Sequence, residues 1–450
     1  MRFDLSKELA RVEESWRQTQ FSEFNPRVSK EQYFTIYGPD GCGKTSVVQD
    51  FVRSRDFAFY FSFEHLSSEE ALSVFLRMYL PGEAGIEDWK AAAAAFVKMR
   101  GGRPTLLVFE DESSPGMIAC SSSLFNYTLT TKSIKVCQIQ EELTRFDSDY
   151  NVELRPRTIV DFLKAFPQYS REDCLRLFAL TGGILTVAKE LDEDASFAEN
   201  VHRLLRFDSA FSTCLPNRLQ ASFRTPESYI PILKSLANGR SRLGEIAKDV
   251  GWSANKCLNY LEALIKHDFV NAEKLEGCSG ASYTLSSSYY IAWCRFVCGK
   301  RALQVGRPDE LYQWLMEEID TAVTLPALQE ACLQFIRRAN KDHLADLRWG
   351  SKTLETKKSV EVKLDRGKRV TLDRYVKTDD AAFCFIFPHT LDAHYTKEEI
   401  RDLWAAVDRY DSRYNTHLTV FSPTRFSDWC VHEAARNKWF HPVTMERLRF

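Results

Sequence analysis

The 450-residue chain lacks several features that would place it in a special class of protein. No apolar run approaches the roughly 20 residues that a membrane-spanning helix needs. The twelve cysteines are scattered and none forms a C-x-x-C pair, which argues against a disulfide framework or a zinc cluster. No signal peptide is recognisable, so we expect a protein of the reducing cytoplasm with no membrane contact. The net charge of −2 provides no overall attraction to nucleic acid, and any such site must come from a local patch.

What the chain does have is the composition of an ordinary globular protein. Hydrophobic residues make up 44% and charged residues 27%. A chain of this length exceeds what one hydrophobic core usually covers, so two to four domains are expected. In the first 110 residues predicted strands alternate with predicted helices, and the strands are continuously apolar. This pattern predicts an α/β core with a parallel sheet.

The most specific pattern is a glycine loop between a predicted strand at residues 32–37 and a predicted helix that runs to about Arg53. The loop is a complete G-x-x-x-x-G-K-[ST] phosphate-binding motif, and its flanks supply the context that the motif requires. Its glycines allow backbone N–H groups to turn around a polyphosphate, and the helix N-terminus adds partial positive charge. Lys44 is expected to reach the β- and γ-phosphates, and the Thr45 hydroxyl to bind Mg²⁺. The predicted nucleotide-binding residues are Gly38, Pro39, Asp40, Gly41, Cys42, Gly43, Lys44, Thr45 and Ser46.

Three carboxylates follow the apolar strand predicted at residues 105–109. A buried strand that delivers carboxylates to the edge of the phosphate loop is typical of the Walker B element. We assign Asp111 to the metal and Glu112 to the attacking water, with Glu110 as the rival for the metal. The alternative is an acidic loop after a buried strand. Residues 117–123 look like a further strand, but the four residues 113–116 are too few for a parallel crossover. Either this segment is a hairpin or loop, or the connecting helix has been lost.

The order of these features resembles prokaryotic STAND-type ATPases, often called archaeal ATPases. The resemblance extends over nearly the whole chain; its strong motif is the phosphate loop, and the other segments are weak singly and persuasive in their order. The matching segments are Gly38–Thr45, Leu106–Glu112, Cys120-Ser121-Ser122 at the place of the family's sensor serine, Leu154-Arg155-Pro156, Thr181-Gly182-Gly183, Asn200, Tyr229–Gly239, Tyr289–Phe296 and Arg348-Trp349-Gly350. The resemblance implies ATP and Mg²⁺ as ligands, a helical lid, a winged helix and a C-terminal domain related to degenerate PD-(D/E)XK nucleases.

The sequence departs from the family in two places. The helix that the family has between Walker B and the sensor strand has no evident counterpart, and the Gly-Arg after the sensor is missing. Arg145, Arg155 or Arg157 could replace that arginine, although each also reads as structural or solvated. A switch that holds nucleotide without hydrolysing it therefore competes with an ATPase.

The resemblance and the residue patterns together give a division into domains. We expect a P-loop NTPase core at 1–150, a helical lid at 151–225, a winged helix at 226–288, a helical linker at 289–345 and an α+β nuclease-like domain at 346–450. In the winged helix, Ser253 is expected to cap a third helix, which in such folds can enter the major groove of DNA. The polar residues on its exposed face are mixed in charge: Asn255, Lys256, Asn259, Glu262 and Lys266.

In the last domain Glu361-Val362-Lys363, with Asp346 upstream, minimally satisfies the carboxylates and lysine of a PD-(D/E)XK nuclease. Aligned to the family, however, Glu361 falls on the first acidic strand and Asp373-Arg374-Tyr375 replaces the E-x-K motif. DNA or a protein partner, bound through the winged helix and this domain, is the alternative to cleavage.

Overall fold

The computed structural model of the protein describes residues 5–21, 33–39, 41–63, 66–83, 85–110, 120, 134–140, 151–274, 280–341, 360–377, 381–413 and 415–448. The chain divides into two compact units, Met1–Pro156 and Arg157–Phe450. Within the described ranges no helix is both long and apolar enough to cross a membrane.

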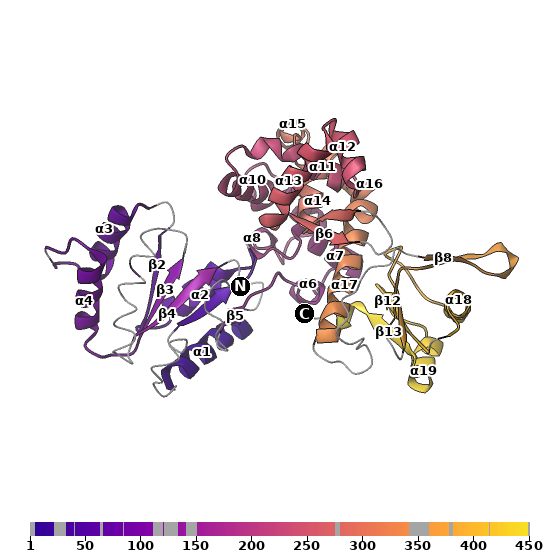
Figure 1. Ribbon diagram of the computed structural model, residues 1–450, viewed down its shortest axis with the longest axis horizontal. Helices are drawn as coiled ribbons and strands as arrows, with labels where there is room; N and C mark the ends of the chain where they lie inside the picture. Colours follow the sequence, from indigo (N-terminus) through magenta and orange to yellow (C-terminus); the bar gives the residue numbers. More distant parts are fainter. Residues whose placement is uncertain are drawn as a thin grey trace. The chain divides into compact units, whose positions relative to one another are not determined.

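The first unit is built on a five-stranded sheet in the order β2-β3-β4-β1-β5 (Figure 1). Its strands are β1 (Tyr33–Tyr37), β2 (Ala58–Ser62), β3 (Thr105–Glu110), β4 (Ile134–Gln140) and β5 (Val152–Glu153). Every neighbouring pair is parallel, which confirms the predicted α/β sheet. Parallel strands bring their carboxyl ends to one edge, so the loop after β1 and the last residue of β3 lie at the same edge.

The helices of this unit begin and end where the local sequence predicts. They are α1 (Ser6–Phe21), α2 (Lys44–Arg53), α3 (Ser68–Tyr79) and α4 (Trp89–Arg100). Ser67 and Glu70 form a reciprocal capping box at the start of α3, and Gly101 ends α4 in the left-handed conformation. The aromatic side chains of α3 and α4, Phe75 and Phe96 among them, pack in one buried cluster with β2, β3 and β4.

The strand between β3 and β1 is not the one that the sequence analysis expects. The prediction of a strand at residues 117–123 is wrong at Cys120, which is helical and buried, while its other residues lie outside the described ranges. The strand that pairs with both β3 and β1 is β4, and residues 111–133 join it to β3. This connection exceeds the length of about ten residues that a parallel crossover needs.

The second unit is mostly helical up to residue 341. Its helices are α6 (Ile159–Ala165), α7 (Arg171–Thr181), α8 (Leu185–Ala188), α9 (Phe197–Leu204), α10 (Ala210–Ser222), α11 (Ile230–Ala237), α12 (Leu243–Val250), α13 (Ala254–Lys266), α14 (Ser288–Phe296), α15 (Arg301–Gly306), α16 (Pro308–Ile319) and α17 (Leu325–Lys341). After α11, α12 and α13 comes an antiparallel hairpin of β6 (Val270–Lys274) and β7 (Ala281–Leu285). Ser253 caps α13 as expected, accepting from the N–H of Lys256.

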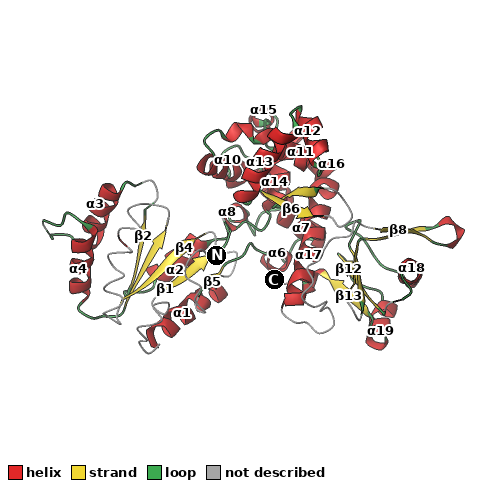
Figure 2. Ribbon diagram, in the orientation of Figure 1, coloured by secondary structure: helices red, strands yellow, loops and turns green. Residues whose placement is uncertain are grey.

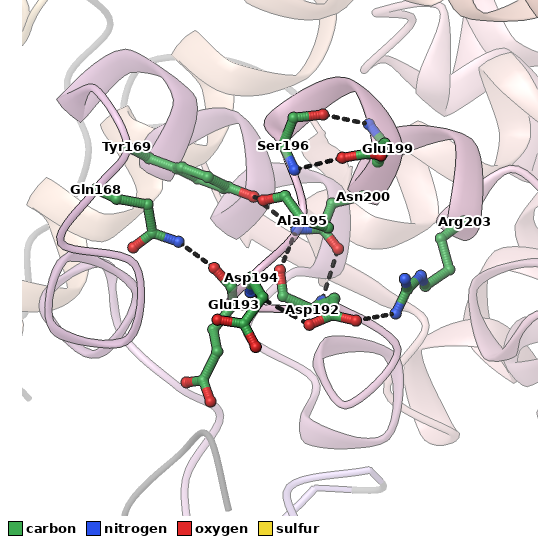
Figure 3. A network of polar contacts seen from close by, with 10 residues as sticks. All are labelled: Gln168, Tyr169, Asp192, Glu193, Asp194, Ala195, Ser196, Glu199, Asn200 and Arg203. Atoms are coloured by element: carbon green, nitrogen blue, oxygen red, sulfur yellow. Dashed lines mark hydrogen bonds and ion pairs between the residues drawn. The ribbon is translucent and has the colours of Figure 1, made fainter.

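A buried polar network fixes the loop between α8 and α9 (Figure 3). The amide Nδ2 of Asn200 donates to the hydroxyl of Tyr169 and to the carbonyl of Asp192, both at 2.7 Å. Its Oδ1 accepts from the N–H of Asp192 at 2.6 Å. Asn200 is fully buried, so all of its polar atoms are satisfied inside the protein.

The C-terminal part of this unit contains a four-stranded sheet in the order β10-β11-β12-β13, separate from a two-stranded hairpin (Figure 2). The strands of the sheet are β10 (Arg374–Lys377), β11 (Ala382–Ile386), β12 (Thr416–Ser422) and β13 (Phe440–Thr444). The hairpin consists of β8 (Val360–Lys363) and β9 (Arg369–Leu372). One face of the sheet packs on α18 (Lys397–Tyr410) and α19 (Asp428–Arg436), and the other on α17 with α6 and α7.

Candidate nucleotide-binding site

The glycine loop has the backbone conformation that its sequence predicts. Gly38, Gly41 and Gly43 have φ values of +152°, +76° and +98°, a region that side chains with a Cβ avoid. A Cβ on Gly38 would also lie 2.1 Å from the carbonyl oxygen of Leu154, just after β5. The loop therefore needs glycine both for its curvature and for its close approach to the neighbouring strand.

The loop directs unpaired backbone donors to the edge of the sheet. Among the described residues, none accepts a hydrogen bond from the N–H groups of Gly41, Gly43 or Lys44. Helix α2 begins at Lys44, so its first-turn N–H groups and the positive end of its dipole are at the same place. Such an arrangement of amides is suited to a phosphate group.

The Lys44 side chain lies back over this loop. Its ammonium donates to the carbonyl oxygens of Gly38 at 2.6 Å and Pro39 at 3.1 Å. An ammonium has three N–H donors, so this arrangement leaves one for a phosphate oxygen. Release of the two carbonyls would make all three available.

A carboxylate of the adjacent strand meets the end of the loop. The Thr45 hydroxyl donates to Oε1 of Glu110 at 2.5 Å, and the Tyr60 hydroxyl donates to Oε2. Tyr60 lies on β2, and its own carbonyl accepts a hydrogen bond from Tyr79 on α3. Three elements of the sequence, separated by up to 65 positions, thus converge on one half-buried carboxylate.

The predicted site residues fall into two groups. The structure brings together the loop residues, Thr45 and Glu110, and Cys42 is buried beneath the loop. Asp40, Asp111, Glu112 and Arg145 lie outside the described residues. Arg155 forms an ion pair with Glu153 at 2.6 Å, as one of the readings of that arginine expected.

Sequence reasoning missed the polar end of β4. Gln140 is paired in register with Tyr37, the residue before the loop, and its Nε2 donates to Oε1 of Gln138 at 3.1 Å. Of the implied sensor segment, Cys120 is helical and does not belong to this strand, while Ser121 and Ser122 lie outside the described residues. Burial raises the pKa of the neighbouring Cys137 thiol, which keeps it protonated and unsuited to metal binding.

The described carboxylates of the C-terminal part do not assemble a metal site. Glu361 and Lys363 lie on the β8–β9 hairpin outside the four-stranded sheet, and Glu361 pairs with Arg369 at 3.2 Å. Asp373 is buried, accepts from the N–H of Phe387 at 2.7 Å, and contacts His389. No cluster of three or more metal-binding side chains is found among the described residues, and Asp346 lies outside them.

Comparison with known proteins gives only remote likenesses. No family model matches the chain, and no curated protein matches it. A STAND protein with a tetratricopeptide repeat sensor from Pyrococcus horikoshii is similar at 15% identity and TM-score 0.26, over 71% of this chain and 49% of that one. Drosophila ORC bound to AT-rich DNA and Cdc6 is similar at 12% identity and TM-score 0.22, over 70% of this chain and 95% of that one. C. elegans PCH-2 is similar at 10% identity and TM-score 0.24, over 58% of this chain and 68% of that one. The chain spans about half the length of the first of these proteins, and likeness at these values assigns it no function.

The class of the first unit follows from its own geometry. A parallel sheet with a glycine loop between its β1 strand and the following helix, and a carboxylate at the end of β3, is an α/β P-loop core.

Proposed function

We propose that the protein binds Mg²⁺·ATP on the loop of residues 38–46 and acts as a STAND-type ATPase or nucleotide-dependent switch. The observation that carries this proposal is the joint presence of unpaired loop amides and a threonine hydroxyl bonded to a strand-end carboxylate. Amides and an ammonium suit a polyphosphate, and hydroxyl and carboxylate oxygens suit Mg²⁺. The donor set therefore fits both ligands.

Thr45 and Glu110 are the residues that we place next to the metal. The sequence pattern favours Asp111 for the metal, but the hydroxyl that is expected to bind Mg²⁺ contacts Glu110 in this structure. Asp111 and Glu112 directly follow this carboxylate in the chain. Asp111 therefore stays a candidate for the metal beside Glu110, and Glu112 stays the candidate that polarises the attacking water. Bound Mg²⁺ would neutralise the charge that develops on the transferred phosphoryl group.

The remaining modules are proposed to respond to the nucleotide. Helices α11 to α13 with the β6–β7 hairpin have the element order of a winged helix, and the C-terminal sheet with α18 and α19 is proposed to be a nuclease-like domain that binds a partner. That partner is DNA or another protein, in the cytoplasm. A nucleic-acid-binding regulator with structural nucleotide and an ATP-gated nuclease are the competing proposals.

The test compares Lys44→Ala with the wild type by titration of a fluorescent ATP analogue in the presence of Mg²⁺. Loss of the ammonium should weaken binding at least tenfold, as expected for about 1.5–3 kcal/mol per charged hydrogen bond. Lys98→Ala, at an exposed position on α4 of the same unit, is the matched control and should bind normally. Full affinity in the Lys44→Ala protein would remove the basis of the proposal.

Hydrolysis is tested separately with Glu110→Gln, Asp111→Asn and Glu112→Gln, each with and without DNA. An ATPase should lose turnover in the variant that removes the metal or water carboxylate while still binding nucleotide. Binding without turnover in the wild type would identify a switch, and salt-dependent DNA binding that ignores Lys44→Ala would favour the regulator.

A further inference from the structure

The C-terminal domain contains a hollow of about 460 Å³ that the proposed nucleotide site does not use. It lies where α18, α19 and the first residues of β12 meet, on the face of the sheet that these helices cover. Its volume is within the range of about 300–1,000 Å³ that small-molecule sites occupy. We call it the tryptophan pocket and define it by Arg401, Trp404, Asp408, Asn415, Trp429 and Trp439.

Three of the nine tryptophans of the chain line this one pocket. Each is half-buried, and Trp404 and Trp429 pack with one side on the hydrophobic core beneath the helices. Among the described residues, none accepts a hydrogen bond from the three indole N–H groups. The pocket thus combines flat apolar surfaces with indole N–H donors that have no described protein partner and are available to a ligand.

The other lining groups are polar and carry both signs of charge. Arg401 and Asp408 lie two turns apart on α18, and within the described part of the chain neither has an ion-pair partner. The side chain of Asn415, at the start of β12, likewise has no described partner. A ligand could therefore exchange donors and acceptors with the pocket without first breaking a salt bridge.

Lysine side chains lie beside two of the three tryptophan rings and limit the class of ligand that the pocket can bind. The Lys397 ammonium lies 5.6 Å from the ring centre of Trp429, and that of Lys438 lies 4.8 Å from the ring centre of Trp439. The pocket lining contains Arg401 and two carboxylates, Asp408 and Glu433. With the two bordering lysines, the cations outnumber the carboxylates by three to two, so a ligand that carries both an anionic group and hydrogen-bond donors fits better than a quaternary ammonium ion. A nucleotide offers the π faces of its base to the tryptophan rings, the edge groups of its base to Asp408 and Asn415, and its phosphate to the cations.

We propose that the tryptophan pocket binds a nucleobase together with the phosphate of its own nucleotide. The ligand is either a free mononucleotide or one position of a single-stranded nucleic acid, and both share this chemistry. The site is separate from the phosphate loop and does not depend on the function proposed for that loop.

The experiment uses the full chain carrying Lys44→Ala, so that nucleotide bound by the phosphate loop does not obscure the signal. Two probes are titrated: a fluorescently labelled eight-nucleotide single strand, and AMP by calorimetry. In this background Trp439→Leu should weaken binding about five- to 150-fold, the loss typical of one stacked base. Trp439→Phe keeps a stacking ring and should largely restore binding.

Arg401→Gln provides a variant that leaves the packing intact, because this side chain is exposed. It should reduce the slope of log K against log salt for the oligonucleotide by about 0.7, the contribution of one phosphate contact. Trp314→Leu is the matched control, since Trp314 is also half-buried and has an ammonium, Lys300, 4.6 Å from its ring centre, but lies on α16.

Binding of the oligonucleotide, of AMP or of both, weakened by Trp439→Leu but not by Trp314→Leu, supports the proposal and identifies the source of the ligand. Absence of binding to both probes, equal losses in the two tryptophan variants, or preferential binding of a trimethyl-lysine peptide would overturn it. Binding of ATP to the chain with intact Lys44 is measured in parallel, so failure here is distinguishable from failure at the phosphate loop.

Discussion

Replacement of Asn200 by alanine should destabilise the second unit by about 3 kcal/mol and leave nucleotide affinity unchanged. The amide is fully buried and makes three hydrogen bonds of 2.6–2.7 Å to Asp192 and Tyr169 (Figure 3). At about 1 kcal/mol net for each bond, their loss gives this figure. Tyr169 also donates to the carbonyl of Ala195, and Asp192 is only partly buried, so neither is left without a partner or access to water.

The magnitude is best measured locally, because a chain of two units need not unfold in a single transition. Hydrogen exchange of the Asp192 amide should accelerate about 100-fold in Asn200→Ala if it exchanges by local opening. Arg203→Ala is the control: it removes an ion pair to Asp192 at 3.0 Å between half-exposed side chains, worth at most about 1 kcal/mol. A tenfold loss of ATP affinity with unchanged exchange would show that Asn200 acts on the ligand and refute the structural reading.

Three further predictions concern the carboxylates. Tyr60→Phe removes a donor to Glu110 and should weaken Mg²⁺-dependent ATP binding about tenfold while leaving binding in EDTA unchanged, as measured by titration. The hydrogen bond to Asp373 raises the pKa of His389. The stabilisation that this contact gives the folded protein is therefore complete below the ordinary histidine pKa of about 6.5 and is lost as the pH rises through the raised pKa. The thermal midpoints of the wild type and His389→Gln should converge at high pH. Glu361→Ala should not change nucleic-acid binding, because this carboxylate is paired with Arg369. For the same reason, wild-type protein with Mg²⁺ should leave labelled DNA uncut. Cleavage by the wild type that disappears in the variant would contradict this prediction.

The parts that the sequence predicts well are those fixed by local chemistry. The capping box of Ser67 and Glu70, the cap of α13 and the glycine conformations of the phosphate loop all depend on residues within a few positions of one another. Helix α18 is of the same kind, because its apolar residues recur at helical spacing after a capping box of Thr396 and Glu399.

Strand β4 was missed because its polar residues are buried. Lys135, Gln138 and Gln140 are each less than 8% exposed, so the segment lacks the continuous apolar run that marks a central parallel strand. The small apolar residues around Cys120 imitate that run more closely. Burial of glutamine is costly unless the amide is bonded, and the contact between Gln138 and Gln140 supplies part of that bonding only once the sheet has formed.

The choice among the three candidate carboxylates shows the same limit. Glu110, Asp111 and Glu112 are consecutive in the sequence. No sequence pattern shows which of the three is the last residue of the strand and which belong to the following loop. The distinction comes from Thr45 and Tyr60, which approach from α2 and β2 and are far from β3 in sequence. A hydroxyl and a carboxylate can share one cation only when they lie next to each other, as Thr45 and Glu110 do. That contact makes Glu110 the residue on which metal binding at this edge should first be tested.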